Sequence, residues 1–468
     1  MALTAAEQLL LELINRARLD PAAEAKRYGV DLNSGLSAGT IDTSSKQVLA
    51  PNAQLERAAT DHSKWMLNAD TFSHTGAGGS SPGDRMAAAG YDFSGSWTWR
   101  ENLAWSGSSG AINLGQAIRE HHEGLYRSAG HRANTFAENI REIGIGQVEG
   151  VFSYQGYGYN ASMLTEKFAK SGGSTFITGV ISRDGDGDRF YDIGEGRGST
   201  WLRGGGDATA SSAAGGYALD VGARSEVTVS IGSGGTTLGR VTLDTGQGNA
   251  KLDLLFQSGG ERMLLLSQSA DMRSGTHDAM LLGVEDLDLR GTGRSNDLWG
   301  NDGRNMIAGE RGGDRIRGEK GADDLRGQGG DDRLWGGSAN DSLSGNSGRD
   351  ELYGGDGGDT LLGGDHADRL FGNGGNDRLN GGGGNDRMTG GGGEDRFIFG
   401  QGDDIVTDFT NNVDTIAISR DRVGSVAEAL DRASVVNGDV VFDFAGGHSL
   451  TLEGVTNLTW LENDLVLY

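Results

Sequence analysis

Aspartate recurs at every ninth residue over a long C-terminal stretch, and this spacing could bind cations. One phase is kept from Gly291 to Thr407, through thirteen units in which position eight is always apolar. Position one is glycine in the first twelve units, and position six is Asn296, Asn305 and then always aspartate. Carboxylates and the carbonyls of glycine turns are the hard oxygens that Ca²⁺ prefers. The sequence therefore predicts calcium ligands at Asp314, Asp323, Asp332, Asp341, Asp350, Asp359, Asp368, Asp377, Asp386 and Asp395.

The composition of these units predicts that their folding depends on the cation. Ordering nine residues costs about 9–18 kcal/mol of backbone entropy, whereas burying one leucine returns only about 1.5–3 kcal/mol. If two units make one coil, the aspartates stack in two columns. At a strand spacing of about 4.8 Å, neighbouring carboxylates repel by about 0.9 kcal/mol even in water. We therefore expect this segment to be disordered without calcium.

A second acidic pattern, "SRDGDGDRFYDIGEG", has the spacing of a twelve-residue calcium loop. Its candidate ligands at positions 1, 3, 5, 9 and 12 are Asp184, Asp186, Asp188, Asp192 and Glu195. The loop departs from the pattern at position six, where Arg189 stands instead of glycine, and it follows the strand-like "TFITGVI". These features predict a calcium site in a loop between strands, without an EF-hand helix pair.

Composition separates two halves of the chain and excludes several classes of function. Most of the 83 glycines lie in the C-terminal half, whereas the three prolines and five of the eight histidines lie near the N-terminus. The net charge of −25 argues against nucleic acid and anionic membranes as partners. The absence of cysteine excludes disulfides and thiolate metal sites. No apolar run is long enough to predict a transmembrane segment, and the N-terminus does not read as a Sec-type signal.

Local patterns predict the elements that would position these groups. Leu9, Leu10, Leu13, Ile14 and Ala17 form one face of an N-terminal helix, and Asp20-Pro21 ends it and begins the next. "EVTVSIG", "GRVTLDT" and "AKLDLLF" predict further strands after the acidic loop, and "VVFDFAGGHSLTLEGV" predicts a C-terminal hairpin.

The nonapeptide pattern resembles the calcium-binding repeat of RTX proteins, which forms a parallel β-roll. This resemblance implies export by a type I secretion apparatus that reads an uncleaved C-terminal signal, with "LENDLVLY" as the tail. The protein would then be secreted, and extracellular or associated with the cell surface. We place a lead-in at 261–290, the roll at 291–407 and a C-terminal cap at 408–468.

Residues 4–170 resemble the bacterial CAP superfamily, an α-β-α sandwich, through "LLELINRARLDP", "FSHTG", "RENLAW", "SAGHRAN" and "IREIGIG". Arg100 and Ala129 depart from the usual glycine and proline of two of these motifs. The resemblance implies a cleft tetrad that contains His74, Glu101 and His131, and such a group could hold zinc with an open position. The fourth member is His121, His122 or Glu123, and we select His122. We expect His62 to be a packed core histidine, and Asn102 and Asn134 to be structural.

The middle segment resembles the small calcium-decorated β-sandwiches of the SdrD B-domain or transthyretin-like kind. We therefore divide the first half into a CAP domain at 1–172 and a β-sandwich at 173–260. Three classes of function stay open for the CAP domain. It could bind a lipid, sterol or glycan between walls that include Trp97, Trp99, Trp105 and Tyr126. It could be a metal-dependent hydrolase such as a peptidase, or an adhesive scaffold. The sequence does not decide whether it is an enzyme.

Overall fold

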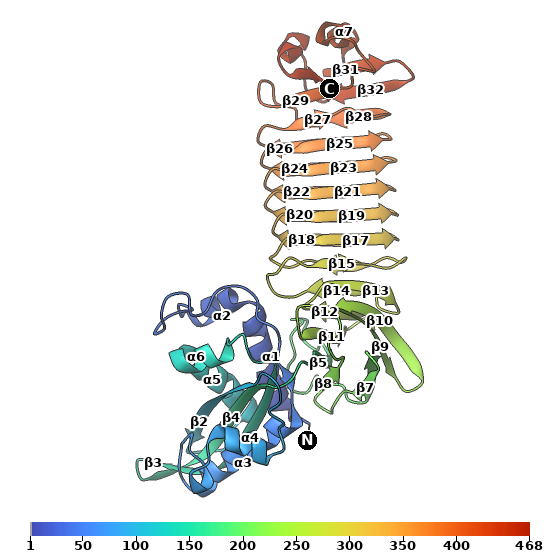
Figure 1. Cartoon of the computed structure of the whole chain (residues 1–468). Coiled ribbons are helices and arrows are strands. Elements are labelled where there is room, and N and C mark those ends of the chain that lie inside the picture. The colour runs from blue at the N-terminus through green and yellow to red at the C-terminus, as the bar shows by residue number, and fades with distance from the viewer. Residues whose placement is uncertain (1) are drawn as a thin grey trace. The chain divides into compact units, whose positions relative to one another are not determined.

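The computed structural model describes residues 2–468, which form two compact units (Figure 1). The first unit is Met1–Gln268 with Leu282–Val284, and the second is Ser269–Leu281 with Glu285–Tyr468. The first contains a region of helices around a sheet and then a region that is mostly strands, and the second contains a parallel roll. The predicted fold class is confirmed. Within residues 2–468, no helix is both long and apolar enough to span a bilayer.

A four-stranded sheet in the order β1-β3-β4-β2 is the centre of the N-terminal region. Its strands are Ala50–Pro51 (β1), Thr98–Ser108 (β2), Glu142–Tyr154 (β3) and Tyr157–Lys170 (β4). Helix α3 (Ala53–Asn68) covers one face, and α1 (Ala5–Leu19) and α5 (Leu114–Arg127) cover the other (Figure 1). A Cβ on Gly144 of β3 would lie only 2.0 Å from the backbone of Leu55, so the close packing of α3 requires glycine there.

Short helices complete this region: α2 (Pro21–Tyr28), η1 (Ala77–Gly79), α4 (Pro82–Ala88) and α6 (Ala129–Thr135). The predicted boundary at Asp20-Pro21 is confirmed, because the Asp20 side chain caps α2 and Pro21 is its first residue. Helix α1 begins with a capping box in which Thr4 and Glu7 satisfy each other's backbone amides.

The polar side of α1 is also buried, which the one-faced apolar pattern did not predict. Glu12 is 2% exposed and pairs with the ammonium group of Lys251, which also pairs with Asp253 at 2.6 Å. Lys251 and Asp253 both lie on β11 (Ala250–Phe256) of the middle region. Strands distant in sequence therefore cover the charged face of α1, and the two regions form one compact unit.

The middle region holds two sets of paired strands within the first unit, and the strands predicted there are confirmed. One set is ordered β8-β5-β11-β12 and the other β7-β6-β9-β10. The remaining bounds are Phe176–Arg183 (β5), Thr200–Gly204 (β6), Asp207–Ala210 (β7), Gly216–Asp220 (β8), Glu226–Ser233 (β9), Thr236–Asp244 (β10) and Arg262–Leu266 (β12).

From Asp288 to Gly392, each strand of the roll pairs in parallel with the strand eighteen residues further on. Ile307 pairs with Leu325, and Leu325 pairs with Leu343. Two nonapeptides therefore make one coil, as the sequence argument assumed, and the position-eight side chains fill the interior. The strands are Ala270–Ser274 (β13), Asp278–Leu281 (β14), Asp288–Arg290 (β15), Asp297–Trp299 (β16), Met306–Arg311 (β17), Arg315–Lys320 (β18), Asp324–Gly329 (β19), Arg333–Ser338 (β20), Ser342–Ser347 (β21), Glu351–Asp356 (β22), Thr360–Asp365 (β23), Arg369–Gly374 (β24), Arg378–Gly383 (β25), Arg387–Gly392 (β26), Arg396–Ile398 (β27) and Asp403–Val406 (β28).

The C-terminal segment closes the roll with strands of its own. The predicted hairpin is confirmed: β31 (Asp439–Phe444) pairs antiparallel with β32 (His448–Leu452), which continues the ladder beside β28. On the other side, β29 (Thr415–Ile418) extends the ladder and pairs with the last strand, β33 (Leu465–Leu467). The remaining elements are α7 (Val426–Asp431), β30 (Ala433–Val436) and η2 (Leu458–Glu462).

Candidate metal centres

The aspartates of the roll are buried in two columns and share one hydrogen-bond pattern. The backbone N–H of Asp350 donates to Oδ1 of Asp368 at 2.8 Å, and this bond repeats from coil to coil. The second oxygen, Oδ2, is buried and accepts no hydrogen bond from protein atoms in Asp314, Asp323, Asp332, Asp341, Asp350, Asp359, Asp368, Asp377, Asp386 and Asp404. Buried polar atoms in native proteins are nearly always satisfied, so a recurring orphan oxygen indicates a missing positive partner.

The surroundings of nine of these orphan oxygens, all except that of Asp404, fit a calcium ion. A Cβ built on Gly345 would lie 2.2 Å from Oδ2 of Asp350 and 2.7 Å from the carbonyl oxygen of Gly363. Carboxylate and carbonyl oxygens therefore converge over the position-one glycine, where any larger residue would fill the space. The asparagines of the first two units differ, because the side-chain amide of Asn305 donates to the carbonyl of Leu287 at 3.0 Å. The donor set fits calcium at the aspartate units, and the asparagine units are satisfied without a cation.

Burial without a cation raises the pKa of these carboxyl groups. The pKa rises to about 8 for Asp332 and Asp368, to about 7 for Asp314 and to about 6 for Asp350 and Asp386, and burial is the largest cause in each. For Asp332 the neighbouring carboxylates of the same column add to the effect. The calcium-free roll therefore favours protonated aspartates.

This shift predicts that acid stabilises the metal-stripped roll. A group whose folded pKa is raised contributes stability that is complete below its unfolded value, near 3.8, and is lost as the pH rises through the folded value. For this roll the loss should fall between about pH 6 and 8. Circular dichroism of stripped full-length protein should therefore show more strand at pH 4.5 than at pH 8, and saturating calcium should remove the difference. Greater strand content at pH 8 in the stripped protein would contradict this account.

Three of the five predicted ligands in the middle loop lie together. One carboxylate oxygen from each of Asp184, Asp186 and Asp188 lies within 4.8 Å of the others. Arg189 adopts a left-handed φ of 60°, so position six takes the conformation that usually requires glycine. Of the other two, Asp192 pairs with Arg119, whereas Glu195 lies against the loop backbone and accepts from the Gly185 amide at 2.6 Å.

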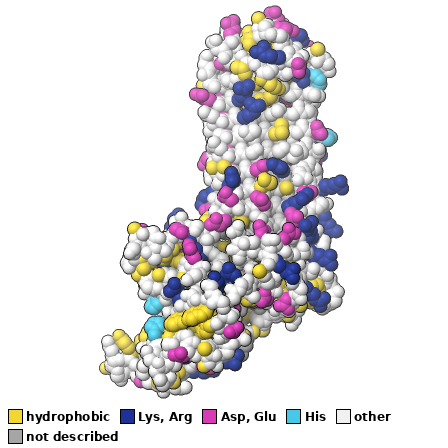
Figure 2. All heavy atoms as spheres, viewed as in Figure 1, with side chains coloured by type: hydrophobic (Ala, Val, Ile, Leu, Met, Phe, Trp, Pro, Cys, Tyr) yellow, Lys and Arg dark blue, Asp and Glu magenta, His cyan; other side chains and the backbone are white. Residues whose placement is uncertain are grey.

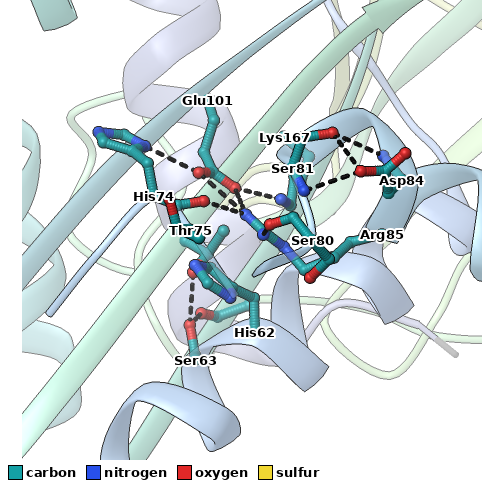
Figure 3. A network of polar contacts seen from close by, with 12 residues as sticks. His62, Ser63, His74, Thr75, Ser80, Ser81, Asp84, Arg85, Glu101 and Lys167 are labelled. Atoms are coloured by element: carbon teal, nitrogen blue, oxygen red, sulfur yellow. Dashed lines mark hydrogen bonds and ion pairs between the residues drawn. The ribbon is translucent and has the colours of Figure 1, made fainter. Parts of the chain in front are cut away.

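The predicted histidine and glutamate of the cleft are in contact. Nδ1 of His74 lies 2.8 Å from Oε1 of Glu101, and 56% of the His74 side chain is exposed (Figure 3). Because the carboxylate only accepts, Nδ1 carries the proton and Nε2 is left as an open acceptor at the surface. Glu101 therefore fixes the tautomer and orientation of His74, as the carboxylate does in carboxylate–histidine pairs.

Two further cations hold Glu101, and sequence reasoning missed both. Lys167, which is fully buried, pairs with Oε2, and Arg85 contacts both oxygens at 2.9 and 3.2 Å (Figure 3). Burial alone would raise the pKa of Glu101, but Lys167, His74 and Arg85 together lower it. Glu101 and Lys167 are directly opposite on β2 and β4. Only knowledge of that register could have identified Lys167.

Asparagines connect α6, which carries His131, to the strand that carries Glu101. Asn134 donates to the backbone carbonyl of Glu101 at 3.2 Å, and Asn102 donates to the carbonyl of His131 at 3.3 Å. His131 is half-buried, and burial lowers its pKa. The helix that carries His131 is therefore held next to the strand that carries Glu101.

The structure places His122, the predicted fourth member, in a different polar cluster. Its Nε2 lies 3.0 Å from Glu24, and its ring packs against Tyr28 and Tyr126. The prediction failed because two adjacent histidines of a helix point in different directions. His121 also lies apart and contacts Ser162 at 3.1 Å. Tyr126 is 2% exposed and belongs to the core, so it does not form a wall of the cleft.

The donor set of the cleft does not fit a hydrolytic zinc site of the usual kind. Such sites supply three protein ligands and leave one position open. Here the imidazoles of His74 and His131 are open, but both oxygens of Glu101 are already held by Lys167, Arg85 and His74. What the arrangement offers chemically is an oriented imidazole with an accessible Nε2, beside a cationic cluster.

Comparison with known proteins agrees with both halves of this description. Residues 11–157 match the CAP, cysteine-rich secretory protein family, and six overlapping segments between 290 and 406 match the RTX calcium-binding nonapeptide repeat. No curated protein sequence matches the chain.

Several solved structures are similar to parts of the chain. An extracellular SCP-domain protein from Bacillus anthracis str. Ames is 22% identical over 35% of this chain, with a TM-score of 0.22, and the match spans 40% of that protein. The AlgE6R3 subunit of the Azotobacter vinelandii mannuronan C5-epimerase is 22% identical over 30% of this chain and 80% of its own, with a TM-score of 0.22. The extracellular lipase LipA from Serratia marcescens is 19% identical over 42% of this chain and 40% of its own, with a TM-score of 0.21.

The helices around a sheet lie in the segment that matches the CAP family. The parallel roll with its buried aspartate columns lies in the segment that matches the RTX repeats. The chain combines a domain of the CAP, cysteine-rich secretory protein family with RTX calcium-binding nonapeptide repeats.

Proposed function

We propose that this protein is exported unfolded and folds outside the cell when calcium fills the aspartate columns of the roll. The observation that carries the proposal is the set of ten buried Oδ2 atoms without protein partners. Where calcium is scarce, these carboxylates oppose folding, and where it is abundant they become its ligands. Calcium would then act as the signal that separates the transported state from the active state.

The position of the C-terminal tail supports export before folding. In the folded roll the tail forms β33, whose Leu465 pairs with Ile416 of β29. A secretion apparatus that reads this tail would find it accessible only before the roll forms. We therefore propose a type I secretion apparatus as the partner of the unfolded chain, and an extracellular or cell-surface location for the folded one.

The middle loop is proposed as a separate calcium site. Support comes from the convergence of Asp184, Asp186 and Asp188, together with the glycine-like backbone of Arg189. Asp192 would have to leave Arg119 in order to join this group.

For the CAP cleft we propose ligand binding through His74 and His131, with a lipid, sterol or glycan as the ligand class. The open Nε2 of His74 suits a head group that donates a hydrogen bond, such as the hydroxyl group of a sterol or a sugar. Trp97 is 54% exposed and offers apolar surface in the same domain. Hydrolysis is the second candidate, favoured by the Glu101–His74 pair, which could take up a proton from an attacking water.

We expect the cleft to bind its ligand without retaining zinc. Full-length protein with calcium, equilibrated with zinc and then dialysed, should keep less than one equivalent in the cleft, because only two imidazoles are free. Palmitate, cholesterol and chitohexaose are the probes for calorimetry, and the double variant His74→Ala, His131→Ala should weaken whichever binds by at least about fivefold.

The control for this experiment is His366→Ala, which removes an exposed histidine of the second unit. The wild type could instead hold one zinc ion tightly, lose it in the double variant and hydrolyse peptides. This result would contradict the ligand-binding proposal and support the hydrolase. If the double variant changes neither the ligand affinity nor the zinc content, both proposals are wrong and the scaffold role is favoured.

A further inference from the structure

A groove of about 800 Å³ runs along the roll, entirely within the second unit. Its lining comes from positions five, six and seven of every second nonapeptide, where each turn meets the following strand. The groove therefore crosses successive coils at the same place. From Arg315 to Arg387 it spans five coils, which is about 19 Å at a strand spacing of about 4.8 Å.

Every one of these five coils contributes one arginine to the groove. Position seven supplies it in four coils, as Arg315, Arg333, Arg369 and Arg387. In the remaining coil position seven is Glu351, and position five supplies Arg349 instead. All five arginine side chains are at least 47% exposed, so a ligand in the groove can reach them.

The fold of the roll does not require arginine at these positions. The nonapeptides of the opposite side keep the same glycine, aspartate and apolar positions, but their position seven carries only one arginine in five units: Met306, Asp324, Ser342, Thr360 and Arg378. Figure 2 shows one face of the roll, on which Lys and Arg side chains lie among mostly uncharged groups. One arginine in every coil of a single groove therefore indicates a ligand on that side.

The arginines of the groove are paired with carboxylates, but only at the surface. Arg333 and Arg369 share Glu351 at 2.9 and 3.4 Å, and Arg349 pairs with Asp331 at 3.0 Å. Exposed ion pairs contribute little free energy, so the carboxylate of a ligand can replace them. Outside the calcium column, five arginines and only two acids line the groove, whereas the whole chain has a net charge of −25. The groove is a local cationic site on an acidic protein.

We propose that this groove binds a linear acidic polysaccharide that carries a carboxylate on each sugar, and that the arginines of successive coils pair with these carboxylates. The planar guanidinium group of arginine matches a carboxylate with two parallel hydrogen bonds. Consecutive 1,4-linked sugar rings of an extended chain advance by about the width of one coil, so the polymer stays in register along the groove.

Spacing and the neighbouring side chains disfavour the other linear polyanions. Side chains on one face of an extended acidic peptide recur every two residues, at about 6.6 Å, and lose register with the coils. Trp335, Tyr353 and Phe371 lie at position nine of the same strands and stack on one another, with ring planes within 6°. Their faces are therefore covered and are not free to stack on nucleotide bases.

The test uses full-length, calcium-loaded protein and calorimetry with hexagalacturonate. The double variant Arg333→Gln, Arg369→Gln should weaken binding at least about tenfold, because it removes two carboxylate contacts. Arg326→Gln, Arg378→Gln is the matched control, because it removes two exposed arginines of the opposite sheet that do not line the groove. Binding to this control should stay within about twofold of the wild type, although its net charge changes equally.

A second comparison uses fully methyl-esterified hexagalacturonate, which keeps the sugar chain and removes its charge. The ester should bind at least about tenfold more weakly than the acid. No binding of hexagalacturonate, equal binding of acid and ester, an equal loss in both double variants, or tighter binding of a glutamate hexapeptide or of hexathymidylate would each overturn the proposal.

This inference goes beyond the proposed function, because neither calcium-dependent folding nor the CAP cleft requires the arginines of the groove. The double variant His74→Ala, His131→Ala should bind hexagalacturonate as the wild type does. Failure of the groove and failure of the cleft are therefore measured separately.

Discussion

Removal of calcium from the full-length protein is expected to unfold the roll and to leave the first unit folded. At pH 7.5 the stripped roll must either ionise buried carboxyl groups or keep them protonated against the solution pH, and both are unfavourable. The interior offers only one apolar side chain per nonapeptide as compensation. The first unit contains a packed apolar core on the sheet and depends on no such columns.

Hydrogen exchange with mass spectrometry on the full chain measures this difference segment by segment. Amides of β17 to β26 should lose at least about 10³-fold of their protection in chelator, equivalent to about 4 kcal/mol, and regain it in millimolar calcium. Amides of β3 and β4 serve as the internal control and should stay protected. The amides of Gly185 and Gly187 report on the middle loop in the same experiment. Undiminished protection of the roll after complete metal removal would contradict calcium-dependent folding and, with it, the export proposal.

The second large effect concerns a single aspartate, whose replacement should act in opposite directions with and without calcium. In Asp350→Asn the amide oxygen can still accept from the N–H of Asp332, but the charge that calcium needs is lost. With calcium, we expect the roll to lose about 2–4 kcal/mol of stability and to need a higher calcium concentration to fold. Without calcium, the same change removes a buried charge. Because burial raises the pKa of Asp350 to about 6, the substitution should stabilise the calcium-free roll by about 3 kcal/mol above pH 7.

The measurements are the calcium midpoint of folding and the pH at which the stripped roll loses strand signal. Both midpoints should rise in Asp350→Asn. Asp331→Asn is the matched control, because Asp331 is exposed at position five, pairs with Arg349 at 3.0 Å and changes the net charge equally. A stripped variant that loses strand at lower pH than the wild type would rule out the carboxylate columns as the obstacle to folding.

The roll was largely predictable from the sequence because its determinants are local and repeated. Each nonapeptide supplies turn glycines and one buried apolar residue, such as Leu325 or Leu343, and from the third unit on it also supplies an aspartate. The phase of the pattern therefore already fixes which residues stack. The C-terminal hairpin was predictable for the same reason, since its strands and turn are adjacent in the chain. The coil of two units was an assumption of the sequence argument, and the eighteen-residue register confirms it.

The cleft could be predicted only in part, because its chemistry depends on residues that are far apart in the sequence. Motifs identified His74, Glu101 and His131, but they did not predict which side chains contact the Glu101 carboxylate. The β2–β4 register places Lys167 opposite Glu101, and α4 brings Arg85 to the same carboxylate. These contacts convert a possible metal ligand into the group that orients His74.

The sequence by itself determined the repeat, its calcium chemistry and the order of the domains, because each of these follows from residue type and spacing within a few dozen residues. Tertiary structure alone decided where His122 points, why the charged face of α1 is buried beneath Lys251, and which atoms of His62 and Arg85 are left without partners. The physical reason is that hydrogen bonds and ion pairs require atoms within about 3–4 Å, and for these residues only the packing of distant segments sets that distance.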